Sequence, residues 1–313
     1  MAYNRLAKLR RDRRYIRRNP AKYRKTAVGR KYGKRRNYRR RPISKRNILN
    51  MTSVKKRDNM LCYTNVSADT NNGGATYRSD VPAILTGGQG VNAVRALLWC
   101  ATARDNTTSS SNVKGTHFDL AARTSTTPYM IGLKEAIEIQ VSTGMPWQWR
   151  RICFTTKGPL PLTYTSTQSV ATETSNGWVR VVNDITGDPG GGQQYALFER
   201  LFKGQNTVDW NDVMTAKVDN TRVSLKYDKT CTLTAGNEDG FIRKYNRWHS
   251  MRKTLVYNDD ELGGGETAQT FSTQGRAGMG DYYVLDLFRA RTGSTVNDQL
   301  SFRPEATLYW HER

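Results

Sequence analysis

The chain has few of the side chains on which catalysis and metal binding depend. Its 313 residues include three histidines and four cysteines. A hydrolytic triad or an acid–base pair needs a positioned base, and His117, His249 and His311 stand in no catalytic or metal-binding motif. We therefore expect a protein that is not an enzyme and that has no metal site and no cofactor.

The four cysteines are too far apart for a metal-binding CxxC pair, and the chain is too long to need disulfides for its stability. Cys62, Cys100, Cys153 and Cys231 are predicted to be buried free thiols, as in a reducing compartment. Long hydrophobic runs are also missing. The longest, Ala96–Ala101, has the length of a strand, so we expect neither a membrane span nor a membrane partner.

Glycine occurs in short clusters that match no nucleotide-binding motif. Gly87–Gly90, Gly190–Gly192 and Gly263–Gly265 lack the spacing of a phosphate-binding loop and its strand and helix context. They are interpreted as loops. The acidic run Asp259–Glu261 is interpreted as a solvated loop rather than a cation site.

Acidic residues are almost absent from the first 57 residues. This segment has 24 Lys and Arg and a single acid, Asp12, whereas residues 58–313 have 26 residues of each sign. The formal net charge of +23 therefore belongs to the N-terminal segment. Because it has very few aliphatic residues, residues 1–57 are predicted to form a disordered basic arm, and residues 58–313 a single folded domain.

Such an arm can neutralise nucleic-acid phosphates, and its tyrosines can stack on unpaired bases, which favours single strands. The predicted nucleic-acid-binding residues are Arg10, Arg11, Arg13, Arg14, Arg17, Arg18, Arg24, Arg30, Lys31, Lys34, Arg35, Arg36, Arg39, Arg40, Arg41, Lys45, Arg46, Lys55, Lys56, Arg57, Tyr15, Tyr23, Tyr32 and Tyr38. Clustered basic residues are also what nuclear-import receptors recognise. The predicted import signals are Arg10, Arg11, Arg13, Arg14, Lys34, Arg35, Arg36, Arg39, Arg40 and Arg41.

The remainder of the chain has the texture of an all-β domain, with short Val-, Ile-, Thr- and Tyr-rich segments between polar or glycine-rich connectors. One helix is predicted, over Gln194–Phe202. The uneven strand spacing favours a two-sheet jelly roll over an up-and-down barrel. The predicted strands are Met60–Val66, Arg95–Thr102, Glu135–Ser142, Trp147–Thr155, Trp178–Asp184, Arg222–Leu233, Phe241–Asn258 with a break, Tyr282–Arg291 and Ala306–His311.

Several segments resemble the coat proteins of small circular single-stranded DNA viruses. An Arg-rich arm precedes the β domain, and the stretch from Arg222 to Asn258 resembles geminivirus coat proteins, including its basic aromatic run Arg243–Trp248. The endings Tyr282–Phe288 and Ala306–Trp310 fit the same pattern. With its compact length, the sequence is most similar to the genomovirus (gemycircularvirus-like) group.

This resemblance implies a structural protein of the virion. It implies an eight-stranded jelly roll of the viral capsid type and a T=1 icosahedral shell of about 60 identical subunits. The arm would line the interior against a circular single-stranded DNA genome and would carry the subunit, through a host import receptor, into the host nucleus. Sixty arms would bring on the order of 1,400 positive charges, which suits a genome of about two thousand nucleotides.

Two other classes of protein remain open at this point. A cellular nucleic-acid-binding protein with a basic tail would share the arm without forming a shell. A cupin-like or carbohydrate-active jelly roll would need clustered His and carboxylate ligands, which this sequence lacks. For Trp147, Trp149, Trp178, Trp210 and Trp248 we expect roles as core or interface anchors.

Overall fold

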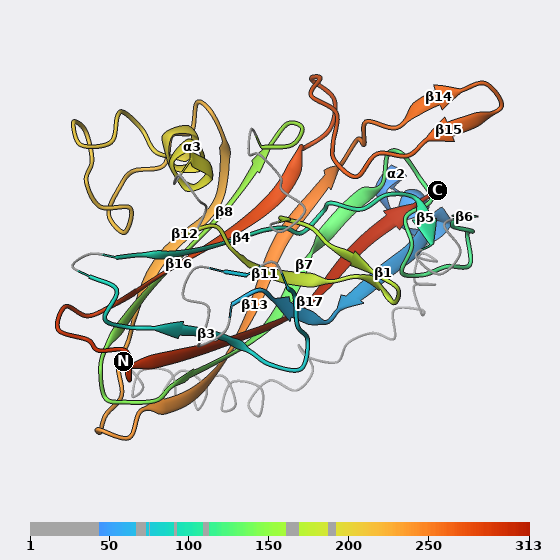
Figure 1. Cartoon of the computed structure of the whole chain (residues 1–313). Coiled ribbons are helices and arrows are strands. Elements are labelled where there is room, and N and C mark those ends of the chain that lie inside the picture. Colours follow the sequence, from blue (N-terminus) through green and yellow to red (C-terminus); the bar gives the residue numbers. More distant parts are fainter. Residues whose placement is uncertain are drawn as a thin grey trace, which may run out of the picture. The chain divides into compact units, whose positions relative to one another are not determined.

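The computed structural model describes residues 44–66, 73–74, 76–90, 93–108, 113–160, 169–186 and 192–313. Residues Asn50–Arg313 form one compact unit, built mainly of antiparallel β-strands (Figure 1). The all-β class predicted from the sequence is confirmed. In the described residues, no helix is long and apolar enough to span a membrane.

Two large sheets make up most of the described part of the unit. In the first sheet the strand order is β1-β17-β7-β13, and β3 pairs with the far end of β17. In the second sheet the order is β12-β8-β16-β4-β11-β2. The first sheet contains β1 (Val54–Met60), β3 (Ala83–Thr86), β7 (Tyr129–Val141), β13 (Phe241–Thr254) and β17 (Gln299–Glu312); the second contains β2 (Cys62–Thr64), β4 (Arg95–Cys100), β8 (Trp147–Thr156), β11 (Arg180–Asp184), β12 (Ser224–Leu233) and β16 (Asp281–Ala290).

Short β-ribbons and helices lie outside the two large sheets. Three two-stranded ribbons are β5 (Thr107–Thr108) with β6 (Val113–Lys114), β9 (Glu173–Thr174) with β10 (Gly177–Trp178), and β14 (Asp260–Leu262) with β15 (Gly265–Thr267). Among the described residues, the helices are α2 (Lys45–Thr52) and α3 (Gly192–Leu201). Helix α3 confirms the helix predicted at Gln194–Phe202, whereas α2 lies within the arm that was expected to be disordered.

The eight main strands form a jelly roll. Along the chain, β1, β4, β7, β8, β12, β13, β16 and β17 alternate between the two sheets, except that β8 and β12 are neighbours within the second sheet. The first sheet thus presents β1-β17-β7-β13 to β4-β16-β8-β12 of the second. Two four-stranded sheets connected in this way are the double Greek key of a jelly roll, as expected.

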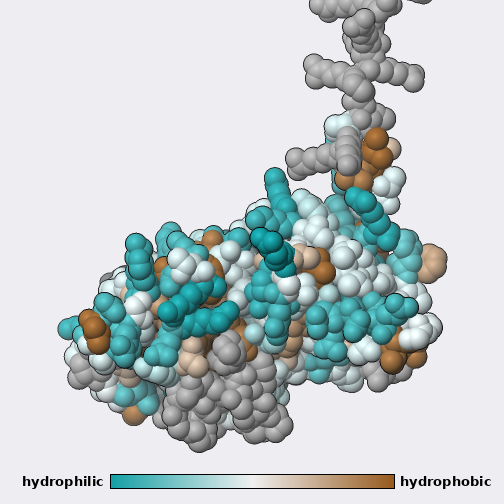
Figure 2. Space-filling model, turned by 90° about the horizontal axis from the view of Figure 1, so that it is seen from above, coloured by the Kyte–Doolittle hydropathy of each residue, from teal (hydrophilic) through white to brown (hydrophobic). Residues whose placement is uncertain are grey.

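The two sheets differ in how many faces they bury. In β7 and β17 buried and more exposed residues alternate, so the first sheet has one core face and one open face. In β4, β8 and β16 nearly every residue is buried, because the outer face of the second sheet is covered by α3 and the segment that follows it. The described surface drawn in Figure 2 is mostly hydrophilic, with hydrophobic residues in small separate groups.

A buried ionic network joins the two sheets. Arg151 of β8 pairs with Glu135 of β7 at 2.5 Å and with Asp286 of β16 at 2.7 Å. Arg180 of β11 reaches the same two carboxylates at 3.1 and 3.5 Å. Burial alone would lower the pKa of Arg151, but Asp286 and Glu135 outweigh it and raise that pKa. Two cations and two anions thus neutralise one another in the core.

His249 of β13, the edge strand next to β7, completes this network. Its Nε2 lies 3.7 Å from Glu135, and its ring packs against Tyr227 with 5.3 Å between ring centroids. Burial lowers the pKa of His249 to about 4, although Glu135 acts in the opposite direction. The imidazole is therefore neutral at pH 7.

Acid is expected to destabilise the folded domain through His249. Between pH 6.5 and 4 the unfolded chain binds more protons at this residue, so stability falls as the pH falls, by up to about 3 kcal/mol in total. His249→Phe keeps the ring contacts and removes the titration. Urea unfolding at pH 7 and pH 4.5 should show a smaller loss in the variant than in the unaltered protein.

Asp281 titrates in the opposite direction, because burial raises its pKa to about 6. Its stabilising effect is present at low pH and is lost as the pH rises through about 6. Both proteins contain Asp281, so the difference between their two losses isolates His249. Equal losses in the two proteins would contradict the assignment.

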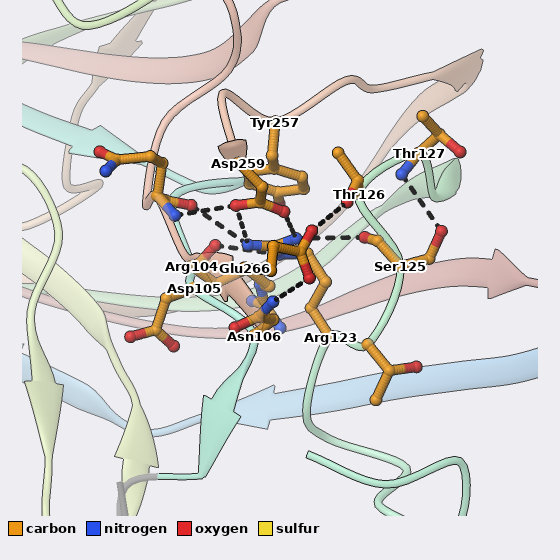
Figure 3. A network of polar contacts seen from close by, with 12 residues as sticks. Arg104, Asp105, Asn106, Arg123, Ser125, Thr126, Thr127, Tyr257, Asp259 and Glu266 are labelled. Carbon is orange, nitrogen blue, oxygen red and sulfur yellow. Dashed lines mark hydrogen bonds and ion pairs between the residues drawn. The ribbon is translucent and has the colours of Figure 1, made fainter. Parts of the chain in front are cut away.

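A second polar cluster fixes the loops at one end of the sandwich (Figure 3). The buried guanidinium of Arg123 pairs with Asp259 at 2.5 Å and lies 3.8 Å from the ring centroid of Tyr257. Its Nε donates to the carbonyl oxygen of Arg104, and Glu266 of β15 accepts from Thr126. The interpretation of Asp259–Glu261 as a solvated loop is therefore wrong for Asp259, whose side chain is buried and paired, and Asp260 and Glu261 belong to β14.

Candidate nucleic-acid interface

Most of the predicted arm contacts lie outside the described residues. These are the basic residues from Arg10 to Arg41 and the tyrosines Tyr15, Tyr23, Tyr32 and Tyr38, including every predicted import signal. Lys45 and Arg46 belong to the first turn of α2. Lys55 and Arg57 lie in β1 with exposed side chains.

Lys56 is a correction to the predicted interface. Its side chain is buried, pairs with Glu312 at 3.1 Å and donates to the carbonyl oxygen of Ala122 at 2.9 Å. Successive residues of a strand point to opposite faces, so at least one of three consecutive basic residues in β1 must turn toward the core, and here it is Lys56. The β structure also begins at Val54, before the expected boundary at Asp58.

Glu312 is held as a carboxylate by this arrangement. Burial would raise its pKa, but hydrogen bonds from Thr124 and Trp310 and the charge of Lys56 hold the pKa below its usual value. Lys56 therefore joins the first strand of the jelly roll to the last one and is not available to nucleic acid.

The two exposed residues of β1 belong to the open face of the first sheet. In strand register, Arg57 is paired with Tyr309 of β17, and Tyr309 with Gly132 of β7. In the next row Lys134 of β7 is paired with Trp248 of β13. We call the set Lys55, Arg57, Lys134, Trp248 and Tyr309 the outer platform.

The ring of Trp248 packs closely against Gly132 of β7. A Cβ atom on Gly132 would lie 2.7 Å from Cζ2 of Trp248, so any larger residue would displace the ring. The ring centroids of Trp248 and Tyr309 are 5.8 Å apart, and 51% of Trp248 is exposed. An exposed indole and a half-buried phenol ring are therefore neighbours on this face.

Positive charge surrounds these rings. The outward positions of the sheet hold Lys55, Arg57, Lys134, Lys244 and Arg303 against two acids, Glu138 and Glu305. Glu138 is engaged by Lys244 at 3.3 Å. A β-bulge after Ser250 adds Arg252, which has a left-handed φ of 48°, and Lys253, both with exposed side chains.

This arrangement suits an unpaired nucleic-acid strand. Exposed aromatic rings stack on bases of any sequence, and the flanking Lys and Arg neutralise phosphates. Duplex DNA would offer the rings no unstacked base. The outer platform is therefore a candidate interface for single strands on the folded domain itself.

Sequence reasoning found only part of the outer platform. Lys55 and Arg57 were predicted to bind nucleic acid, whereas Lys134 and Tyr309 were not, and Trp248 was expected to be a core or interface anchor. Of the five tryptophans considered, Trp147 and Trp149 are buried, Trp178 and Trp210 half-buried, and Trp248 exposed. The period-two pattern around Glu135 was the available signal, since it turns Lys134 outward.

Cys153, His249 and Glu135 lie in a row in space, in the order of the nucleophile, base and carboxylate of a catalytic triad. The Sγ of Cys153 is 3.9 Å from Nδ1 of His249. However, Cys153 is fully buried between the sheets, and burial raises its pKa to about 12. Without access or a thiolate, this row of residues is a packing contact. Cys62, Cys100 and Cys153 are buried free thiols as predicted, whereas Cys231 is half-buried.

No protein-family model matches the sequence, and no curated protein matches it significantly. One solved structure found by the comparison is VP1 of the Trichodysplasia spinulosa-associated polyomavirus in complex with 3'-sialyllactose. The two chains are 9% identical, the alignment covers 83% of this chain and 94% of that one, and the TM-score is 0.11. At that score the two structures do not superpose, so the assignment as a jelly roll rests on the strand order.

Removing the exposed indole should weaken single-strand binding. For Trp248→Ala in the full chain we expect a loss of about 1–3 kcal/mol in the binding of an oligothymidylate, measured by fluorescence anisotropy at fixed salt. Trp248→Phe should lose less, because it keeps a ring. Tyr195→Ala is the matched control, since Tyr195 is an exposed aromatic on α3, over the other sheet. Equal losses in W248A and Y195A would remove Trp248 from the interface.

Proposed function

We propose that this protein is a viral capsid subunit that packages circular single-stranded DNA. Identical subunits assemble through the jelly roll into a small icosahedral shell with T=1 symmetry. The basic arm condenses the genome and directs the subunit into the host nucleus. Virion and host nucleus are the corresponding locations, and the protein performs no catalysis.

The observation that carries the proposal is a basic, aromatic face on a jelly roll. Jelly rolls build many viral shells, and here one sheet is covered on both faces while the other keeps an open face. Lys55 and Arg57 on that face continue directly, in sequence, from the Arg-rich segment. Single-stranded DNA bound by the arm can therefore continue onto the open face of the folded domain.

The first experiment is to express the full chain and examine it by sedimentation and negative-stain imaging, with absorbance to detect co-purified nucleic acid. Uniform spherical particles with nuclease-protected DNA are the expected result. A monomer or small oligomer that binds nucleic acid reversibly under varied assembly conditions would overturn the capsid proposal and favour a cellular nucleic-acid-binding protein.

A further inference from the structure

The free edges of the two sheets lie side by side and carry unbalanced positive charge. β12 ends the second sheet and β13 ends the first, and the contact of Tyr227 with His249 brings them together. These two strands contain seven Lys and Arg and one acid, Asp228. Asp228 is already paired with Arg150 at 2.6 Å, on the side of the sheet that faces α3.

Arg247 is the most unusual of these cations. Its side chain is half-buried between the edges, 5.8 Å from the ring centroid of Trp149 and 5.6 Å from that of Tyr245. Its Nε is buried without a hydrogen-bond partner, and Arg247 forms no ion pair among the described residues. Glu135, directly across the β7–β13 ladder, is engaged by Arg151 and Arg180.

β12 lines the other side of this opening. Lys229 is paired in register with Arg151, and Cys231 with Trp149, so both lie on the side that faces β13. Lys229 is exposed and Cys231 half-buried. We call the set Tyr227, Lys229, Cys231, Tyr245 and Arg247 the edge seam.

Excess positive charge is costly in a partly buried place unless an anion compensates it. The guanidinium can bind two oxygens of one group at once, Lys229 adds a second charge, and both tyrosine hydroxyls can donate hydrogen bonds. A tetrahedral oxyanion has the charge and the number of acceptor oxygens that match this donor set.

We propose that the edge seam binds a phosphate group, supplied either by the backbone of a nucleic-acid strand or by free inorganic phosphate. The backbone source rests on the proposed function, because it extends the outer platform around the edge of β13. On the outer face of β13, Trp248 then contacts the bases and Lys244 the phosphates of the bound DNA. On the inner side of β13, Arg247 binds a further phosphate.

Cys231 provides a local reporter for this site. In the full-length protein, the rate of its alkylation by iodoacetamide is measured by mass spectrometry at constant ionic strength, alone, with inorganic phosphate and with an oligothymidylate. A ligand at ten times its dissociation constant should slow the reaction about tenfold, because roughly one tenth of the seams stay free. Arg247→Gln should abolish the protection, and Arg276→Gln, at an exposed arginine between β15 and β16, should keep it.

The two sources give different results. Protection by both ligands assigns the site to free phosphate, and protection by the oligonucleotide alone assigns it to the backbone. If the oligonucleotide binds by anisotropy but neither ligand protects Cys231, the edge seam is overturned while the proposed function stands. If Arg247→Gln fails to fold, Lys229→Gln, at an exposed position, gives the same test; unchanged protection in that variant would also contradict the proposal.

Discussion

Arg151→Met is expected to destabilise the folded domain by about 3–5 kcal/mol. The substitution leaves the carboxylates of Glu135 and Asp286 buried with only Arg180 between them, and an uncompensated buried charge is among the costliest changes in a core. Urea unfolding of the unassembled subunit, followed by tryptophan fluorescence, measures the loss. The midpoint should fall with little change in slope.

Lys244→Met is the matched control. It breaks the ion pair with Glu138, but the Lys244 side chain is 77% exposed, and such pairs contribute little. We expect a change of at most about 1 kcal/mol in its free energy of unfolding. If Arg151→Met changed stability as little as Lys244→Met, the ionic network would not be what joins the two sheets.

Deleting residues 1–41 should abolish packaging while leaving a folded domain. The deletion removes 19 Lys and Arg and one Asp, so the formal net charge falls from +23 to +5. Too few cations then remain to offset the phosphates of an enclosed genome. The expected result is the loss of nuclease-protected DNA, measured by absorbance and electrophoresis, with an unchanged circular dichroism spectrum. A deletion variant that packages as much DNA as the full chain would contradict this role.

A charge-preserving variant separates the effect of net charge on DNA binding from the effect of the arginine side chains themselves. Replacing Arg35, Arg36, Arg39, Arg40 and Arg41 by Lys keeps the net charge, whereas replacing them by Ala lowers it. The Ala variant should show a shallower dependence of DNA binding on salt, and the Lys variant a nearly unchanged one. Equal salt slopes in all three proteins would show that these residues do not touch phosphate.

Local sequence patterns predicted the strands well, both where residues alternate between a buried and an open face and where both faces are buried. The alternation in Glu135–Ser142 and the apolar run at Arg95–Thr102 both correspond to strands, β7 and β4, and the amphipathic segment at Gln194 to α3. The break expected within Phe241–Asn258, whose position the sequence did not predict, corresponds to the bulge after Ser250. These signals depend only on residues close together in the sequence, so they can be recognised from one sequence alone.

The candidate interface could not be predicted in this way. The outer platform depends on which residues of four strands fall into the same rows, and that register is set by long-range pairing. Lys56 shows the limit most plainly, because composition groups it with Lys55 and Arg57. Its partner, Glu312, is distant in the sequence and becomes a neighbour only when β1 pairs with β17.

The position of β17 has a consequence for synthesis of the protein. This strand comes last of all the elements along the chain, yet it lies between β1 and β7 and also pairs with β3. Until residues 299–312 have left the ribosome, β1 lacks the one strand with which it pairs among the described residues, and β7 lacks one of its two described neighbours. A nascent chain therefore cannot close the first sheet early, and a complete jelly roll exists only once synthesis has passed β17.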